Sequence, residues 1–141
     1  MKLFYTFGFF LLFSSNTIAQ DSTQEINIVE HLPIYSGCEK KTTEEKRNEC
    51  TTTELYKFVA KNVKFPHDLK GKRYEGISYV EFSVDITGKI VDSVIVRGFL
   101  GEMGSKFDKE ALKVVGKIPN MTPGMTLGTP QLVKYIVPVR F

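Results

Sequence analysis

The last ten residues of the chain, Leu132–Phe141, place an apolar side chain at every second position. That spacing is typical of a β-strand with one buried face. The strand contains Pro138, which has no backbone N–H to donate to a neighbouring strand. We therefore expect it at the edge of a sheet, where bare backbone groups need protection or serve to bind another strand. Its buried face would consist of Val133, Tyr135, Val137, Val139 and Phe141.

Two further strands are expected in the middle of the chain. Ser78–Ile86 alternates with the same period of two, and Ile90–Val96 resumes the pattern after a break at Gly88. Glycine adopts the positive φ angles that tight hairpin turns need. The two segments therefore predict an antiparallel hairpin. The buried face of its first strand would consist of Val80, Phe82, Val84 and Ile86.

Two segments show the apolar spacing of amphipathic helices. The first helix is expected to begin at Thr51–Thr53, in a capping box, and to end before Pro66. The second is expected over Ser105–Ile118, with Ser105 as its N-cap. The order helix, strand, strand, helix, strand predicts an α+β fold of two layers. Two helices would cover one face of a small three-stranded antiparallel sheet.

The first 19 residues resemble a secretory signal peptide. Lys2 supplies the positive start, Leu3–Phe13 is an apolar run of 11 residues, and Thr17–Ala19 places small residues at a cleavage site. The run is shorter than the about 20 apolar residues that span a bilayer. We therefore expect residues 1–19 to be removed on export. An uncleaved membrane anchor is the alternative.

Cys38 and Cys50 both follow the predicted signal peptide. A pair of cysteines in an oxidising compartment usually forms a disulfide, so we expect one here. It would close the charged segment Glu39–Glu49, which is expected to be solvated and partly helical. A zinc site is the alternative, but zinc favours closer spacing and more ligands than His31 and His67 add. We therefore predict no metal site.

Charge and motifs argue against several classes of function. The formal net charge of +3 is too small to favour nucleic acid or an anionic membrane as a partner. Neither histidine, His31 nor His67, stands in a motif with the serine or cysteine nucleophile that acyl transfer needs, and adjacent His67 and Asp68 are typical of a surface turn. The glycine spacing of Gly98–Gly104 matches neither a P-loop nor a dinucleotide fingerprint. We predict no enzyme activity, no catalytic residue, no cofactor and no small-molecule substrate.

Several motifs together resemble a known family. They are Phe65-Pro66-His67-Asp68-Leu69, the hairpin segment Val80–Ile90, the helix start Phe107–Leu112, and Gly128-Thr129-Pro130 followed by Val137–Phe141. In this order, Thr53–Phe141 resembles the C-terminal domain of TonB, the periplasmic energy transducer of Gram-negative bacteria. Leu69 stands where the family usually has Ala, and Met121 where it often has Trp. Residues 20–52 would precede this domain as a lead-in that contains the disulfide-closed loop.

The resemblance implies protein binding in the periplasm. The family domain pairs with the TonB box, a short segment near the N-terminus of an outer-membrane transporter. In this chain the C-terminal edge strand would pair with that segment, and backbone hydrogen bonds would supply affinity. Tyr135 and Lys134 would add specificity, and Pro138 would limit the reach of the pairing. The implied partner-binding residues are Gln131, Leu132, Val133, Lys134, Tyr135, Ile136, Val137 and Pro138.

The same edge strand also permits a second function. The chain is expected to lack the membrane-spanning helix and the Pro-rich linker through which TonB couples to the motor proteins ExbB and ExbD. The alternative is therefore a self-associating or adapter module of the same fold without energy transduction. Two copies would form a homodimer by pairing their edge strands.

Overall fold

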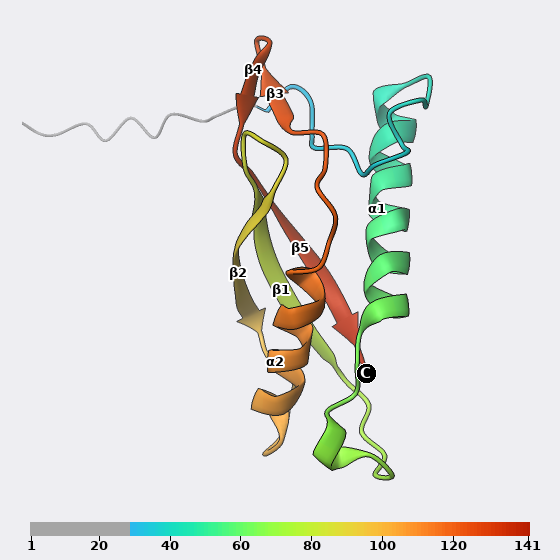
Figure 1. Cartoon of the computed structure of the whole chain (residues 1–141), viewed down its shortest axis with the longest axis vertical. Helices are drawn as coiled ribbons and strands as arrows, with labels where there is room; N and C mark the ends of the chain where they lie inside the picture. Colours follow the sequence, from blue (N-terminus) through green and yellow to red (C-terminus); the bar gives the residue numbers. More distant parts are fainter. Residues whose placement is uncertain (1–28) are drawn as a thin grey trace, which may run out of the picture.

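The sheet at the centre of the molecule has three antiparallel strands in the order β2-β1-β5 (Figure 1). The strands are β1 (Ile77–Val84), β2 (Ile90–Arg97) and β5 (Val133–Arg140). The computed structural model describes residues 29–141, so the predicted signal peptide lies outside the described residues. Because β1 has a partner on each side, β5 is an edge strand, and that prediction is confirmed.

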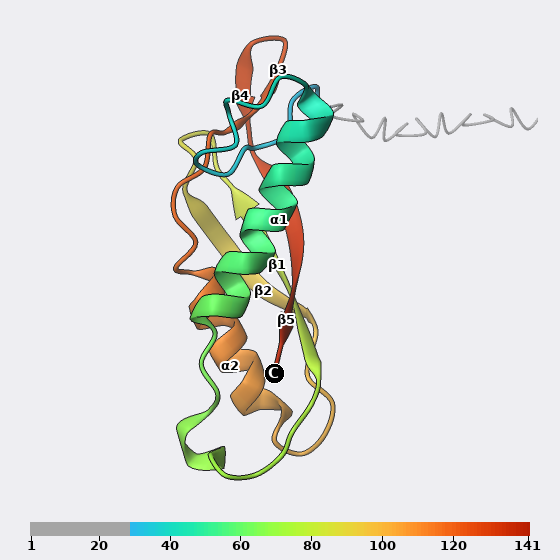
Figure 2. The same cartoon turned by 90° about the vertical axis from the view of Figure 1, so that its right-hand side faces the viewer.

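Two helices, α1 (Glu44–Asn62) and α2 (Gly104–Val115), pack on the same face of this sheet (Figure 2). Three shorter elements complete the described chain: η1 (His67–Leu69), β3 (Gly124–Thr126) and β4 (Thr129–Gln131). One core joins the helices to the sheet, and its fully or nearly fully buried members include Leu55, Val59, Val80, Phe82, Val84, Ala111, Val114, Val115, Val137 and Val139. The predicted two-layer α+β fold is confirmed.

Helix α1 begins seven residues earlier than predicted. Its N-cap is Thr43, whose hydroxyl accepts a hydrogen bond from the N–H of Lys46 at 3.3 Å. Glu44 and Glu45 follow in the first turn, where acidic side chains stabilise the helix dipole. The expected start at Thr51–Thr53 is therefore wrong. The helix also runs through the boundary predicted between residues 52 and 53, while the expectation of a partly helical charged segment is confirmed.

The β1–β2 hairpin turns at Asp85–Lys89. The carboxylate of Asp85 accepts hydrogen bonds from the N–H groups of Thr87 and Lys89 at 2.8 and 3.0 Å. The Thr87 hydroxyl also donates to it, and this bond lowers the pKa of Asp85. Gly88 has the positive φ angle, 86°, that the turn requires. Ile86 lies in the turn and is 59% exposed, so its expected place on the buried face is wrong.

Helix α2 begins at Gly104 and ends at Val115, three residues before the predicted end. The prediction of Ser105 as N-cap is wrong, because Met103 occupies that position without a side-chain hydrogen bond. The first residue of the helix is glycine because a side chain would not fit there. A Cβ atom on Gly104 would lie 2.2 Å from the carbonyl oxygen of Phe99. The loop before α2 therefore packs too closely for a side chain there.

Candidate protein-binding edge

Strand β5 pairs with β1 in one unbroken register. The pairing runs from Ile77 opposite Arg140 to Val84 opposite Val133 without a bulge. Of the eight predicted partner-binding residues, Gln131 lies in β4, where it pairs with Gly124, and Leu132 lies between β4 and β5. The other six lie in β5. The regular part of the candidate edge is therefore Val133–Arg140.

The direction of each backbone group in β5 follows from the end of the ladder. Gly76 and Phe141 exchange two hydrogen bonds, of 3.4 and 3.0 Å, which defines a hydrogen-bonded pair. Such pairs alternate with non-hydrogen-bonded pairs along an antiparallel ladder. Every second residue of β5 therefore directs its N–H and C=O away from β1, and these residues are Lys134, Ile136, Pro138 and Arg140.

Pro138 occupies one of these outward positions. Its missing N–H would point to the open side of the strand, so the β1–β5 ladder loses no hydrogen bond. Proline in this register protects part of an edge without weakening the sheet. The edge therefore offers complete outward backbone groups at Lys134, Ile136 and Arg140 and only a carbonyl at Pro138.

The side chains of β5 divide between the two faces of the sheet. Val133, Val137 and Val139 are buried, as predicted, and Val137 and Val139 belong to the core that the sheet shares with the helices. Tyr135 points the same way and stacks on Phe82, with ring centroids 5.8 Å apart. Its hydroxyl donates a hydrogen bond of 3.0 Å to the carbonyl of Pro33. Burial raises the pKa of Tyr135 to about 12. Tyr135 is thus engaged inside the domain, on the helix side of the sheet.

The opposite face of β5 is open to solvent. Ile136 is 54% exposed there, and the neighbouring Leu132 is 50% exposed. Lys134 forms an ion pair with Glu81 of β1, with Nζ 2.9 Å from the carboxylate. Two apolar side chains, Leu132 and Ile136, are thus accessible beside the outward backbone groups.

The other edge of the sheet, β2, is irregular. Its register with β1 shifts twice, between Tyr79 and Val80 and between Glu81 and Ser83. Asp92 has a φ angle of 52°, which is uncommon for a residue other than glycine. Bulges of this kind twist an edge and hinder the addition of another strand. Of the two edges, only β5 presents a regular row of backbone groups.

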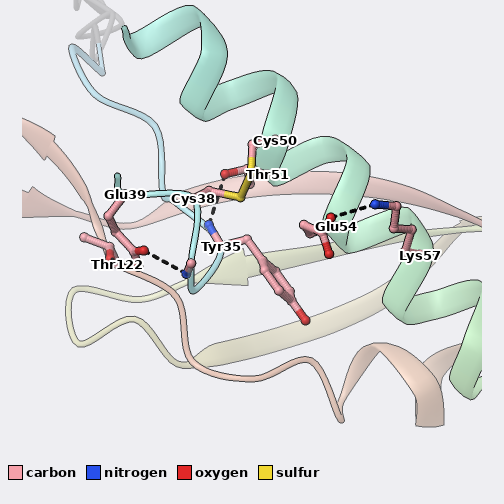
Figure 3. The surroundings of a disulfide bond; sticks show 9 residues. Tyr35, Cys38, Glu39, Cys50, Thr51, Glu54, Lys57 and Thr122 are labelled. Carbon is pink, nitrogen blue, oxygen red and sulfur yellow. Dashed lines mark hydrogen bonds and ion pairs between the residues drawn. A yellow bond between two sulfur atoms is a disulfide. The ribbon is translucent and has the colours of Figure 1, made fainter. Parts of the chain in front are cut away.

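The segment before α1 holds the start of β5 in place. His31 and Ile34 form bridges with Met125 and Thr122, and Pro33 accepts the bond from Tyr135. The predicted disulfide is confirmed: Cys38 and Cys50 are bonded, with their Cα atoms 5.8 Å apart (Figure 3).

The disulfide fastens this lead-in to α1 beside a second contact. Thr51 is buried, and its hydroxyl accepts a hydrogen bond of 3.0 Å from the N–H of Tyr35 (Figure 3). Because the lead-in also bonds to Tyr135, the covalent link and the hydrogen bonds together join α1, the lead-in and β5.

The two histidines lie in different parts of the domain. His31 contacts Glu44 at 3.2 Å, whereas His67 is exposed in η1 beside Asp68, which pairs with Lys106. Within residues 29–141, no group of three or more histidine, cysteine or acidic side chains is placed to hold a metal ion. Neither helix of the described part combines the length and hydropathy of a membrane-crossing helix.

A two-layer α+β domain with one regular, open sheet edge has the features of a protein-interaction domain. The chain belongs to the family of C-terminal domains of the Gram-negative bacterial TonB protein, whose family model matches residues 61–141. Searches of the curated proteins and of the solved structures give no match. The family is a non-enzymatic, transport-associated interaction family, and its domain is periplasmic. Membership implies a TonB-like role in TonB-dependent transport.

Proposed function

We propose that the chain is an exported periplasmic protein that pairs its β5 edge with an extended segment of an outer-membrane transporter, the TonB box. The observation that carries this proposal is the contrast between the two sheet edges. β5 keeps an unbroken register and directs backbone groups outward, whereas bulges interrupt β2. Strand addition needs a regular edge of the first kind.

In this proposal, the partner strand binds to the outward backbone groups of β5. Lys134 and Ile136 each offer an N–H and a C=O, so they anchor the pairing. Pro138 offers no N–H, so one hydrogen bond is missing there. The exposed side chains of Leu132 and Ile136 bury apolar surface when the added strand lies beside them.

A proline at position 136 tests the pairing directly. Ile136→Pro removes an outward donor at a position equivalent to Pro138, so the β1–β5 ladder keeps its hydrogen bonds. The matched control Ile136→Ala shortens the side chain and keeps the donor. The mature proteins, residues 20–141, would be used to capture transporters from solubilised envelopes of the native bacterium. Hydrogen exchange would then report whether the β5 amides become protected.

We expect Ile136→Ala to capture the same transporters as the unaltered protein and Ile136→Pro to capture none. Circular dichroism and the thermal midpoint would show that both variants fold. If Ile136→Pro captures transporters as well as Ile136→Ala does, binding does not use the backbone of this edge.

Export by a cleaved signal peptide is part of the proposal. The apolar run of Leu3–Phe13 and the small residues of Thr17–Ala19 support it, and the disulfide is compatible with an oxidising compartment. Intact-mass analysis of the protein from the periplasmic fraction should give a chain that begins at Gln20. A mass that includes residues 1–19, found in the membrane fraction, would instead indicate a retained anchor.

Self-association is the alternative use of the same surface. Two β5 edges can pair antiparallel about a two-fold axis, because each presents the same row of outward groups. Sedimentation equilibrium over a wide concentration range would distinguish the two cases. The self-associating module would be favoured by two results together: a dimer that the Ile136→Pro substitution dissociates, and no captured transporter.

A further inference from the structure

A hollow lies between α1 and the C-terminal part of β5. Its volume is about 300 Å³, and it is lined by Tyr56, Val59, Ala60, Pro138 and Arg140. Its two β5 residues both direct their backbone groups away from β1. The hollow therefore lies on the open side of β5, at the point where the regular row of outward donors is interrupted by Pro138.

The walls of the hollow are chemically distinct. The helix contributes an aromatic ring, Tyr56, which is 47% exposed, and the aliphatic side chains of Val59 and Ala60. Strand β5 contributes Pro138 and Arg140 to the lining, and Arg140 is exposed. Among residues 29–141, Arg140 forms no ion pair with an acidic side chain. The site thus combines an apolar wall with one uncompensated positive charge.

The N-terminal end of β5 has a different environment. There the lead-in packs against the strand, and Pro33 accepts the hydrogen bond from Tyr135. The hollow lies at the C-terminal end of the strand, so only the side chains of an added strand at that end lie beside it. The volume of the hollow is at the lower limit for small-molecule pockets, which is suited to one large side chain.

We propose that this hollow is a specificity pocket of the β5 edge. It receives one aromatic or large aliphatic side chain of the paired segment, and a neighbouring acidic residue of that segment binds Arg140. The inference rests on the proposed function, because it assumes a segment paired with β5. In strand addition, the backbone supplies affinity and pockets for individual side chains supply specificity. The helix residues of this pocket precede the residues that the family model matches, 61–141.

The test uses a phage-displayed library of random ten-residue peptides as the probe. It would be selected in parallel on the mature protein and on three variants. Ala60→Trp fills the hollow from an exposed helix position, and Lys61→Trp adds the same bulk at the next residue, which does not line the hollow. Arg140→Glu reverses the charge at the pocket.

We expect peptides selected on the unaltered protein to share a large apolar residue next to Asp or Glu. They should bind Ala60→Trp at least tenfold more weakly and Lys61→Trp equally well. Selection on Arg140→Glu should replace the acidic residue by Lys or Arg. If the selected sequences and affinities are the same for all four proteins, the pocket is overturned.

Ile136→Pro, tested with the same peptides, separates the two proposals. If Ile136→Pro abolishes binding while Ala60→Trp and Arg140→Glu leave it unchanged, the edge binds peptides without a specificity pocket. If Ile136→Pro binds the peptides normally, or if selection yields none, peptide pairing at β5 and the pocket are both wrong.

Discussion

The hydroxyl of Ser78 donates a hydrogen bond of 2.7 Å to the carboxylate of Asp108, and this contact joins the buried start of β1 to α2. The same carboxylate oxygen accepts a bond of 2.8 Å from the N–H of Phe99. The carboxylate of Asp108 thus satisfies two donors from outside its own helix, so it stabilises the packing of the two layers.

Removal of this carboxylate should therefore destabilise the domain. Asp108→Ala leaves the Ser78 hydroxyl and the Phe99 N–H without their acceptor, which should lower the free energy of unfolding by about 1–3 kcal/mol. Asp108→Asn keeps an acceptor oxygen and should lose less. Urea unfolding of the three proteins measures the difference. Equal midpoints for Ala and Asn would show that the hydrogen bonds contribute little.

The disulfide should contribute strongly to stability. It joins residues 12 apart. A closed loop of that size lowers the entropy of the unfolded chain, and in the entropic account this adds about 3 kcal/mol to the free energy of unfolding. Replacing Cys38 and Cys50 together by Ala should lower the thermal midpoint clearly. The lead-in should also exchange its amide hydrogens faster, beginning with Tyr35. An unchanged midpoint after reduction of the unaltered protein would contradict this expectation.

Two glycines allow backbone strain to be separated from crowding. Gly88 and Gly128 both have positive φ, 86° and 74°. A Cβ on Gly88 would lie 1.9 Å from the carbonyl oxygen of Met121, whereas a Cβ on Gly128 would meet no atom within 4 Å. Gly128→Ala should therefore cost about 1–2 kcal/mol from the backbone conformation alone.

Gly88→Ala should cost clearly more than Gly128→Ala, because Met121 must also move and its N–H bonds to the carbonyl of Gly88 at 2.8 Å. Chemical denaturation of both variants against the unaltered protein measures the two losses. Losses of the same size would mean that the turn accommodates the extra methyl group without displacing Met121.

The free energy of unfolding should decrease at alkaline pH because of the ionisation of Tyr135. Its folded pKa of about 12 lies above the unfolded value near 10, so the folded state favours the neutral phenol. Above pH 10 the unfolded chain loses this proton first, and the free energy of unfolding decreases as pH rises towards 12. Tyr135→Phe should reduce this decrease. Denaturation midpoints at pH 8 and 11 for both proteins provide the comparison, and parallel pH profiles would contradict it.

The strands could be predicted from sequence because their signals are local. A period of two along Ser78–Val84 and Val133–Phe141 reports one buried face, and Pro138 reports an edge. The register of β5 could not be predicted in the same way. The register depends on the hydrogen-bonded pairing of Gly76 with Phe141. That pairing shows that the backbone groups of Pro138 point away from β1.

The start of α1 could not be predicted from apolar spacing. The segment Glu44–Cys50 is largely polar, and its helix is held by the Thr43 cap, the disulfide and the contact between Tyr35 and Thr51. The cap is a local hydrogen bond, and the other two are a covalent link and a long-range contact, so apolar periodicity reports none of them. The pocket residues Tyr56 and Ala60 were missed for a related reason, since only the packing of α1 beside β5 brings them to the candidate site.

The bulges of β2 also determine how many strands the sheet can accept. A sheet with two regular edges can grow in both directions, as fibres do, whereas this one has a single regular edge. In the proposed function, one added strand, from a transporter or from a second copy, would pair along the whole of β5. The two partners would therefore compete for the same edge, and binding of one would exclude the other.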